Sequence, residues 1–281
     1  YNWYDTQTLE ILPPAYVSSV DSGNFACCLV SLKEGLRDYM SEKREIQSLI
    51  DRIEDIISTT NLNVFYNKVK DLIAIGYDTQ ENKLSASHYD LLMSESRMSS
   101  YFAVAKRQVP KKHWRALGRT MARLGSYAGP ISWTGTMFEY FMPELLLHSN
   151  EGSLPYEGLR FCLHCQKKRA RDANSPFGIS ESGYYAFDAQ LNYQYKAHGV
   201  QKLGLKRRLD DELVISPYSS FLTISHDFNS SYNNLENLKK LGMVGTYGFY
   251  EAIDYTASRV GRNCSAIIKS FMAHHLGMSI V

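Results

Sequence analysis

Apolar residues recur at the spacing of an α-helix along most of this chain, in about ten segments. Long loops rich in glycine, aromatic and acidic residues separate alternate segments, and strand patterns are almost absent. Paired helices around a common axis are typical of an α/α toroid, whereas the alternative, a plain helical bundle, has shorter loops. The spacing therefore predicts an all-α toroid. Since the helices are fewer than a full toroid needs, we expect one or both ends of it to be missing.

The apolar periodicity also places the individual elements. We expect helices at residues 24–40, 42–58, 61–72, 90–106, 110–124, 136–148, 154–173, 217–226, 231–241 and 265–280. Residues 72–78 are expected to form a short strand or an extended arm, because β-branched residues run into a glycine turn. No linker rich in glycine, serine or proline divides the chain, so residues 1–281 are expected to form a single domain, a fragment of a longer protein.

The composition narrows the class of protein. Hydrophobic residues make up 44% and charged residues 21% of the 281 residues, which is typical of a globular chain. The net charge is +2 without a basic block, which argues against nucleic acid as a partner. No apolar run approaches the roughly 18 residues of a membrane helix, and the first residues do not form a secretory signal. We therefore expect a cytoplasmic segment without membrane contact.

Five cysteines, an odd number with Cys27 and Cys28 adjacent, indicate a reducing compartment rather than a disulfide framework. Cys162 and Cys165 have the spacing of half a zinc site, but no second pair accompanies them. We expect no metal and no cofactor. The chain also lacks the G-x-S-x-G, P-loop and G-x-G-x-x-G motifs, so a serine hydrolase, a kinase and a dinucleotide enzyme lose support.

The sequence Ser-Glu-Ser occurs twice, around Glu95 and around Glu181, and each copy follows apolar residues. A carboxylate beside an apolar run tends to lose water, which raises its pKa. Two such groups facing one cleft are what acid/base chemistry on a glycosidic bond requires. The alternative is a pair of solvated glutamates on helices.

The chain contains 20 tyrosines, and aromatic residues reach 12%. Tyrosine has a flat apolar face and a polar tip, which suits a hydrated surface that binds sugars. The aromatic, acidic and amide residues gather in loops before helices, which in a toroid can surround one end of the central cavity. The alternative for any single tyrosine is packing between helices.

In these loops the chain resembles the glucoamylase-like domain in the middle of cyclic β-1,2-glucan synthases. The matching stretches are NWYDTQTLEILPPAYVSSVDSGN (2–24), YDLLMSESR (89–97), VPKKHW (109–114), SWTGTMFEYFMP (132–143), FGISES (177–182), NYQYKAHGVQKLGLKR (192–207), YGFYEAIDYT (247–256) and MAHHLGMS (272–279). They follow in order over nearly the whole chain.

The resemblance implies an (α/α)6 barrel that acts on linear β-1,2-glucan and closes it into a ring with retention of anomeric configuration. The parent synthases carry a glycosyltransferase part in the membrane, so the parent protein is expected to be associated with the inner membrane. The first helices of the barrel should precede Tyr1. The missing segments of the parent chain, or a second subunit, are therefore expected partners besides the glucan.

The resemblance also assigns roles to residues. Glu181 in FGISES would be the acid/base and Glu95 in LLMSESR the nucleophile, with Glu139 in MFEYF as the main rival for either role. A retaining pair of carboxyl groups lies about 5–5.5 Å apart, whereas an inverting pair lies roughly 6.5–9.5 Å apart. The acid needs a raised pKa, and the nucleophile should stay ionised. Expected sugar contacts are Trp3, Tyr4, Asp5, Asp21, Trp133, Glu139, Tyr140, Tyr193, Gln194, Tyr195, Glu251 and Tyr255.

Three other functions stay open. An endo-acting β-1,2-glucan hydrolase would share the barrel but leave room for a water between its acids. A glucoamylase-type hydrolase is the second, and a non-catalytic carbohydrate-binding module, in which the acids only form hydrogen bonds, is the third.

Overall fold

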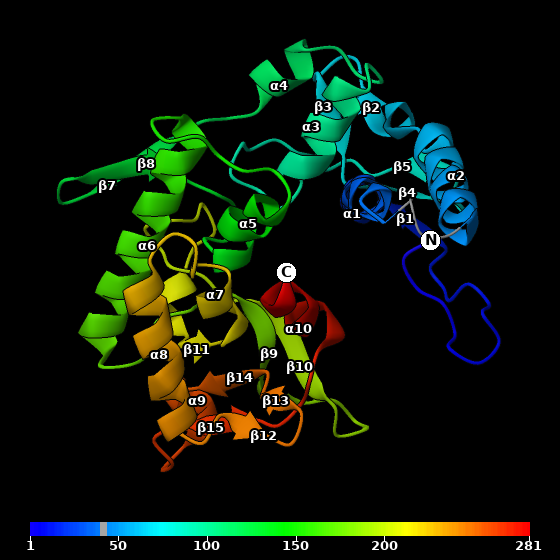
Figure 1. Ribbon diagram of the computed structural model, residues 1–281. Coiled ribbons are helices and arrows are strands. Elements are labelled where there is room, and N and C mark those ends of the chain that lie inside the picture. The colour runs from blue at the N-terminus through cyan, green and yellow to red at the C-terminus, as the bar shows by residue number, and fades with distance from the viewer. Residues whose placement is uncertain (40–43) are drawn as a thin grey trace. The chain divides into compact units, whose positions relative to one another are not determined.

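The computed structural model describes residues 1–39 and 44–281 (Figure 1). Contacts divide the chain into two compact units, Tyr1–Gly118 and Arg119–Val281. Within the described residues, no helix combines the length and the apolar character needed to cross a membrane.

The first unit combines helices with two small antiparallel sheets. Its helices are α1 (Ser19–Arg37), α2 (Arg44–Thr59), the 3-10 helix η1 (Leu62–Phe65), α3 (Arg97–Ala105) and α4 (Lys112–Ala116). One sheet has the order β1 (Tyr16–Ser18), β4 (Gly76–Asp78) and β5 (Lys83–Leu84), and the other β2 (Tyr66–Asn67), β3 (Leu72–Ala74) and β6 (His88–Tyr89).

Three helices of this unit share a core. Ala26 of α1, Ile53 and Ile57 of α2 and Phe102 of α3 are buried in one apolar cluster. Ser18 caps α1 at its N-terminus, because its hydroxyl oxygen accepts a hydrogen bond from the backbone N–H of Asp21 at 3.1 Å. Burial of these apolar side chains stabilises the unit.

The second unit has more strands. Its helices are α5 (Met137–Phe141), η2 (Met142–Leu145), α6 (Leu154–Ala173), η3 (Leu209–Asp211), α7 (Tyr218–Phe221), α8 (Phe228–Lys240), α9 (Ala257–Val260) and α10 (Ala273–Ile280). The pairs β7 (Met121–Leu124) with β8 (Tyr127–Pro130), β9 (Glu181–Phe187) with β10 (Tyr193–Ala197), and β12 (Val244–Gly245) with β13 (Gly248–Phe249) form hairpins. A three-stranded sheet has the order β11 (Val214–Ile215), β14 (Ala252–Asp254) and β15 (Ala266–Ile268).

Helix α6 organises this second unit. Ser153 caps its first turn, and Asn174 ends it in the left-handed conformation with φ 49°. Helix α8 lies beside it in Figure 1, and Lys167 Nζ donates a hydrogen bond to Ser230 Oγ across the pair at 2.8 Å. The buried side chains of Leu159, Phe161 and Cys162 anchor α6 in the core.

Several expected elements are confirmed. The structure has helix α6 at the expected residues 154–173, and strands β3 and β4 where an extended segment was expected at 72–78. Helix α1 begins five residues before the expected 24–40 and ends at Arg37, and α2 covers the expected 42–58 from Arg44 on. Residues 40, 42 and 43 of these expected helices lie outside the described residues. Helix α8 covers most of 231–241, and α7 covers the first half of 217–226.

The near absence of strands was wrong, because the described residues contain fifteen short strands. Most have two or three residues, too few to show an alternating pattern. Residues 61–72 form η1 and β2 rather than one helix, and residues 265–280 divide into β15 and α10. The expected helical character is therefore confirmed, but the expectation of an all-α fold missed these small sheets.

The expected helix at 90–106 begins only at Arg97, so Glu95 lies in a turn before α3. Pairing with a distant segment explains the difference. The backbone N–H of Leu92 donates to the Gly118 carbonyl, and that of Gly118 to the Asp90 carbonyl. These long-range hydrogen bonds hold residues 90–92 extended, which local sequence does not reveal.

Two further expected helices are shorter than their periodicity suggested. The segment 110–124 forms only α4, and its end becomes β7, which turns back into β8 at Gly125 with φ +62°. The segment 136–148 divides into α5 and η2, where Pro143 stands at the start of the 3-10 turn. Proline lacks the backbone N–H that a continuing α-helix needs.

Candidate active site

Glu181 is the first residue of β9, and its backbone is fixed from three directions. The side-chain amide of Gln166 on α6 donates to the Ile179 carbonyl at 2.8 Å, and its oxygen accepts from the Ile179 N–H at 3.0 Å. The buried Ser180 hydroxyl accepts hydrogen bonds from the Phe138 N–H and the Tyr218 hydroxyl. The Tyr218 hydroxyl oxygen also lies 3.0 Å from the Glu181 backbone carbonyl oxygen. A rigid backbone therefore aims the carboxyl group of Glu181.

Glu181 itself is half-buried. The pKa of Glu181 is raised to about 7, first by burial and then by the negative charge of Glu139. The hydrogen bond from the Tyr195 hydroxyl, at 3.4 Å, lowers the pKa and so offsets part of this rise. A carboxyl group with a pKa near neutrality can both donate and accept a proton, as a general acid/base must.

A second carboxylate, that of Glu251, reaches this hairpin from the loop that precedes β14. Glu251 Oε1 accepts a hydrogen bond from the Gly183 N–H at 3.1 Å, and Oε2 lies 3.0 Å from His275 Nδ1. His275 Nε2 in turn lies 3.4 Å from the Tyr195 hydroxyl. The Tyr218 ring stacks on the His275 ring with centroids 3.9 Å apart. Glu251, His275 and Tyr195 thus form a continuous chain of contacts that ends at Glu181.

Glu139 is buried, and its hydrogen bonds stabilise the loop that precedes α5. It forms a capping box at the start of α5, in which the Thr136 hydroxyl accepts from the Glu139 N–H. Its carboxylate accepts hydrogen bonds from the backbone N–H groups of Trp133, Thr134 and Thr136 and from the hydroxyls of Ser132 and Thr134. Only 4% of the surface of Glu139 is exposed. Its negative charge raises the pKa of Glu181.

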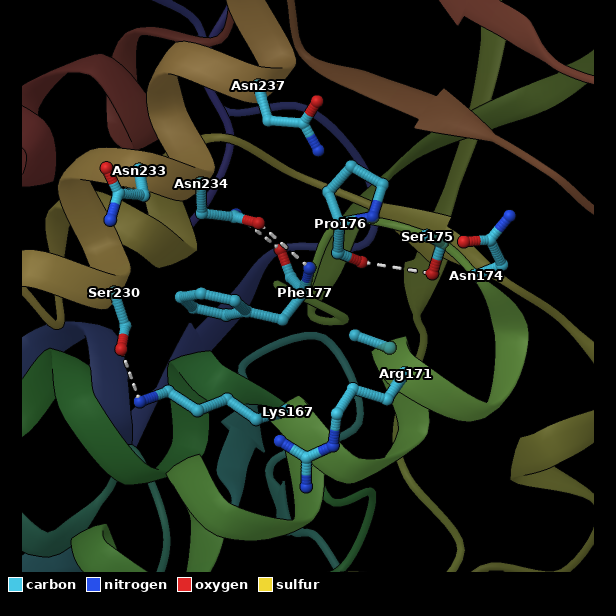
Figure 2. Close-up of a pocket in the computed structure, with 11 residues that line it drawn as sticks. Lys167, Arg171, Asn174, Ser175, Pro176, Phe177, Ser230, Asn233, Asn234 and Asn237 are labelled. Atoms are coloured by element: carbon cyan, nitrogen blue, oxygen red, sulfur yellow. Dashed lines mark hydrogen bonds between the residues drawn. The ribbon is translucent and has the colours of Figure 1, made fainter.

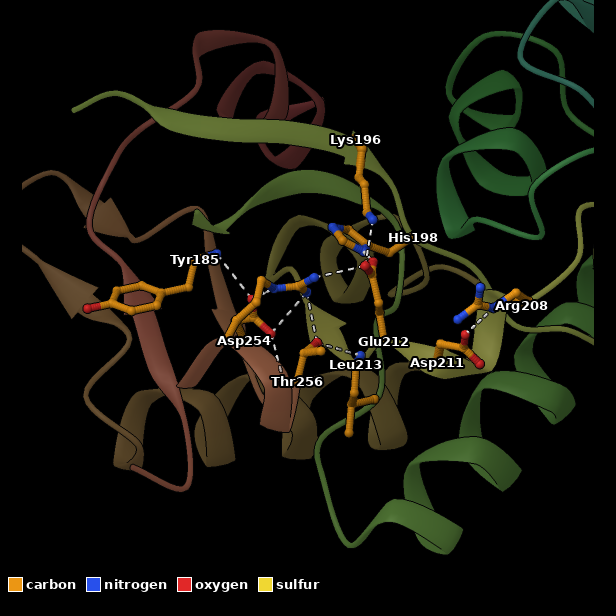
Figure 3. A network of polar contacts seen from close by, with 10 residues as sticks. Tyr185, Lys196, His198, Arg208, Asp211, Glu212, Leu213, Asp254 and Thr256 are labelled. Carbon is orange, nitrogen blue, oxygen red and sulfur yellow. Dashed lines mark hydrogen bonds and ion pairs between the residues drawn. The ribbon is translucent and has the colours of Figure 1, made fainter. Parts of the chain in front are cut away.

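The opposite face of the β9–β10 hairpin rests on a network of charged side chains, shown in Figure 3. Glu212 accepts hydrogen bonds from Lys196 at 2.6 Å, His198 at 3.0 Å and Arg259 at 2.8 Å. The hydrogen bond from His198, followed by those from Lys196 and Arg259, holds the pKa of Glu212 well below its usual range. Arg259 also pairs with the fully buried Asp254 at 2.7 Å.

This network holds both strands of the hairpin. Lys196 belongs to β10, and Asp254 accepts a hydrogen bond from the backbone N–H of Tyr185 on β9 at 3.1 Å. Side chains alternate along a strand, so Lys196 faces away from Tyr195 and Glu181. The charged network therefore supports the strands from one face, while the candidate acid occupies the other.

A cavity of about 300 Å³ borders the Glu181 network. Its wall includes Tyr218, Glu251 and His275, together with Tyr247, Phe249 and Tyr250. A separate cavity of about 420 Å³ lies between α6 and α8 and is lined by Lys167, Arg171 and four asparagines (Figure 2). Tyr195, whose hydroxyl contacts the Glu181 carboxyl group, does not line this second cavity.

Residues 87–281 match the family model described as "Putative glucoamylase". The chain belongs to this glucoamylase-like family. The cyclic β-(1,2)-glucan synthase NdvB of Rhizobium meliloti (strain 1021) is 36% identical over 260 residues. That alignment covers 91% of this chain but only 9% of NdvB, so the chain spans less than a tenth of that relative.

Solved structures share the fold of the glucoamylase-like chain. The endo-β-1,2-glucanase of Chitinophaga pinensis, in complex with sophorotriose and glucose, matches with a TM-score of 0.68 and 14% identity, over 94% of this chain and 64% of the other. The endo-β-1,2-glucanase of Talaromyces funiculosus, in complex with sophorose, matches with a TM-score of 0.73 and 13% identity, over 98% and 59%. The likeness is one of fold.

The expected site residues of the second unit take different places in this glucoamylase-like chain. Tyr195 and Glu251 belong to the chain of contacts at Glu181, whereas Trp133 lies in the loop held by Glu139, with 46% of its surface exposed. Tyr140 is fully buried, and its hydroxyl donates to the carbonyl groups of Pro130 and Leu203. Its ring therefore packs in the core and leaves no surface for a sugar.

The remaining three expected contacts of this unit are half-buried. The Tyr193 ring packs against Phe187 at 4.9 Å, and Gln194 pairs with Tyr184 in the β9–β10 ladder. Burial raises the pKa of Tyr255, whose backbone N–H donates to the Leu213 carbonyl.

The expected site residues of the first unit lie near its N-terminus and before α3. Trp3 and Tyr4 are about half exposed, and Asp21 accepts a hydrogen bond from Asn2 at 2.6 Å. Asp5 accepts hydrogen bonds from the backbone of its own turn, which lowers its pKa. Glu95 is half-buried in its turn, with the Ser94 hydroxyl 3.1 Å from Oε2.

The sequence did not single out three residues that shape the site. Gln166 and Tyr218 fix the Glu181 backbone, and His275 connects Glu251 to Tyr195. Gln166 and Tyr218 carry no motif of their own, and His275 was not among the expected site residues. Their roles depend on partners far away in the sequence.

Proposed function

We propose that this chain is the transglycosylase part of a cyclic β-1,2-glucan synthase, which closes linear β-1,2-glucan into a ring with retention of anomeric configuration. The observation that carries the proposal is Glu181, a partly exposed carboxyl group whose pKa is raised to about 7. The relative NdvB is named a cyclic β-(1,2)-glucan synthase, and two fold neighbours are endo-β-1,2-glucanases, one in complex with sophorotriose and glucose and the other with sophorose. Both support a β-1,2-linked substrate.

The proposed reaction has two displacements. Glu181 protonates the leaving glycosidic oxygen while Glu95 attacks the anomeric carbon and forms a glycosyl ester. Glu181 then takes the proton from a hydroxyl group at the non-reducing end of the same glucan, and that oxygen displaces Glu95 and closes the ring. Each carboxyl group returns to its starting state. A retaining mechanism of this kind needs two carboxyl groups about 5–5.5 Å apart.

The wider assignment is part of the same proposal. Both units belong to one glucoamylase-like domain with an (α/α)6 barrel that other segments of the parent chain, or a second subunit, complete. The domain works on the cytoplasmic side of a parent protein associated with the inner membrane.

An endo-acting β-1,2-glucan hydrolase is the second candidate, which the endo-β-1,2-glucanases among the fold neighbours favour. Incubation with linear β-1,2-glucan followed by mass spectrometry separates the two. A cyclic product is lighter by one water than the linear glucan of the same length. Cyclic products support the transglycosylase, whereas linear sophorooligosaccharides alone would replace it with the hydrolase.

The same assay tests whether the chain is an enzyme at all. Glu181→Gln and Glu95→Gln should each remove turnover, while the exposed Glu151→Gln, the same chemical change elsewhere, should not. Glucan binding without turnover in the unmodified chain would make it a carbohydrate-binding module. Unchanged turnover in both variants at the two candidate acids would overturn the assignment of the site.

A further inference from the structure

The hydroxyl group of Tyr195 lies between two acceptors but carries a single hydrogen. Its oxygen is 3.4 Å from Glu181 Oε2 and 3.4 Å from His275 Nε2. A phenol donates one hydrogen bond and can accept another. The hydrogen can therefore point to only one of these partners at a time.

Glu251 determines which nitrogen of the His275 ring carries the hydrogen. An ionised carboxylate only accepts, so the hydrogen of a neutral His275 ring lies on Nδ1, 3.0 Å from Glu251 Oε2. Nε2 is then left with a lone pair that faces the Tyr195 hydroxyl. Glu251 is held in place because its other oxygen accepts from the Gly183 N–H at 3.1 Å.

The imidazole ring has little freedom to turn away. His275 is 3% exposed, and the Tyr218 ring stacks on it with an interplanar angle of 19°. The Tyr218 hydroxyl in turn donates to Ser180, next to Glu181. With the His275 ring fixed, the main freedom in this chain of contacts is the direction in which the Tyr195 hydroxyl hydrogen points.

We propose that the Tyr195 hydrogen follows the charge of Glu181, and that Glu251 and His275 are positioning residues that act through it. Before glucan binds, protonated Glu181 donates to Tyr195, and Tyr195 donates to His275 Nε2; when the leaving oxygen is in place, the Glu181 hydrogen turns to it. Once Glu181 has given its proton to the leaving oxygen, the Tyr195 hydroxyl rotates and donates to the new carboxylate. No proton passes between Tyr195, His275 and Glu251, and no covalent bond of these three residues changes. The inference rests on the proposed role of Glu181 as acid/base.

The groups around Glu181 explain why such a donor is useful. Glu139 acts on it with a negative charge, Glu251 lies in the same chain of contacts, and Tyr218 and His275 complete the wall. Burial and the charge of Glu139 oppose ionisation of Glu181, and the Tyr195 hydrogen bond favours it. The hydroxyl therefore gives both states of Glu181 a hydrogen-bond partner.

The proposal predicts shifts of opposite sign in the pKa of Glu181, read from ¹³C NMR of its carboxyl group during a pH titration of the 281-residue chain. Tyr195→Phe removes the donor and should raise that pKa by about half a unit or more. Glu251→Gln should lower it. The amide oxygen keeps the Gly183 contact, so its NH₂ group donates to His275 Nδ1 and moves the ring hydrogen to Nε2. Tyr195 must then accept from His275 and donate to Glu181.

A double variant separates this mechanism from simple loss of charge. If Glu251 acts through Tyr195, the lowering caused by Glu251→Gln should largely vanish in the Tyr195→Phe background. An equal lowering in both backgrounds, or no effect of Tyr195→Phe alone, would overturn the proposal. Tyr185→Phe is the matched control, because this exposed tyrosine of β9 should leave the pKa of Glu181 unchanged.

A measurement on the unmodified chain avoids dependence on variants that fold poorly. The ¹⁵N shifts of the His275 ring should show a hydrogen on Nδ1 and none on Nε2 at a pH where Glu181 is protonated. A hydrogen on Nε2, in the other tautomer or in the doubly protonated ring, would overturn the proposal. Activity remains a separate measurement. If Glu181→Gln keeps turnover, the proposed function fails while the coupled pKa shifts stand. If the pKa shifts are absent but Glu181→Gln is inactive, only this inference fails.

Discussion

Glu181 and Tyr195 occupy diagonal positions on the same face of the β9–β10 hairpin, and the Tyr195 hydroxyl lies 3.4 Å from Glu181 Oε2. Antiparallel pairing sets Glu181 opposite Ala197 and Tyr195 opposite Gly183. Diagonal neighbours in such a ladder come within reach of a long aromatic side chain. The hairpin thus supplies both the candidate acid and the group that regulates its ionisation.

The raised pKa of Glu181 predicts the pH dependence of turnover. A general acid works in its protonated form, which is lost as the pH rises through about 7. We expect kcat/KM on linear β-1,2-glucan to fall about tenfold per pH unit well above that value. Glu181→Gln should reduce kcat by roughly 10²- to 10⁴-fold and remove this alkaline limb. A rate that stays constant up to pH 9 would contradict the role of Glu181 as acid.

The division of roles between the two carboxyl groups can be tested by azide rescue. In Glu95→Ala a small anion fits where the nucleophile was and attacks in a single displacement, so the glycosyl azide should have the inverted configuration. In Glu181→Ala the nucleophile remains, and azide should instead give the retained configuration after two displacements. Proton NMR of the anomeric centre distinguishes the products. Exchanged outcomes would exchange the two roles.

Glu139→Gln should cost stability rather than chemistry. The carboxylate accepts hydrogen bonds from Trp133, Thr134 and Thr136, and an amide cannot accept at both atoms. We expect a loss of about 2 kcal/mol in the free energy of unfolding, measured by urea denaturation, with Glu151→Gln as the neutral control. The pKa of Glu181 should fall at the same time, because a negative charge is removed. A loss of kcat on the scale of Glu181→Gln with unchanged stability would instead make Glu139 a catalytic residue.

Arg259→Met should destabilise the support of the hairpin. It leaves the buried Asp254 without its cation and removes one of the three donors to Glu212. We expect a loss of about 3 kcal/mol in the free energy of unfolding at pH 7. The exposed Arg262→Met should have almost no effect.

The pH dependence of this loss has a definite sign. Burial alone would raise the pKa of Asp254, but the hydrogen bond from Arg259 lowers it, and the pKa of Glu212 is lowered as well. Groups with a lowered folded-state pKa stabilise the fold above their unfolded pKa near 4, and this contribution is lost as the pH falls. The difference between Arg259→Met and the unmodified chain should therefore shrink on acidification from pH 7 to pH 3. A difference independent of pH would assign the loss to packing.

Local signals were sufficient for part of this protein. Helix α6 was predicted at its observed residues, because a long amphipathic run lies between a capping serine and a left-handed asparagine. The family was also recognisable from ordered short stretches, which the match over residues 87–281 confirms. The hairpin of β7 and β8 was missed although Gly125 marks its turn, since apolar spacing over 110–124 favoured a helix.

The sequence by itself determined where the long helices α2 and α6 lie and singled out Glu181 as a candidate acid, because apolar periodicity and a motif are contained in neighbouring residues. Only the tertiary structure decided that the pKa of Glu181 lies near neutrality, that Tyr195 contacts it, and that Glu139 serves its own loop. The physical reason is that desolvation and hydrogen bonding depend on groups brought together from distant positions. His275 is 80 residues from Tyr195, and Glu251 is 68 residues from Gly183.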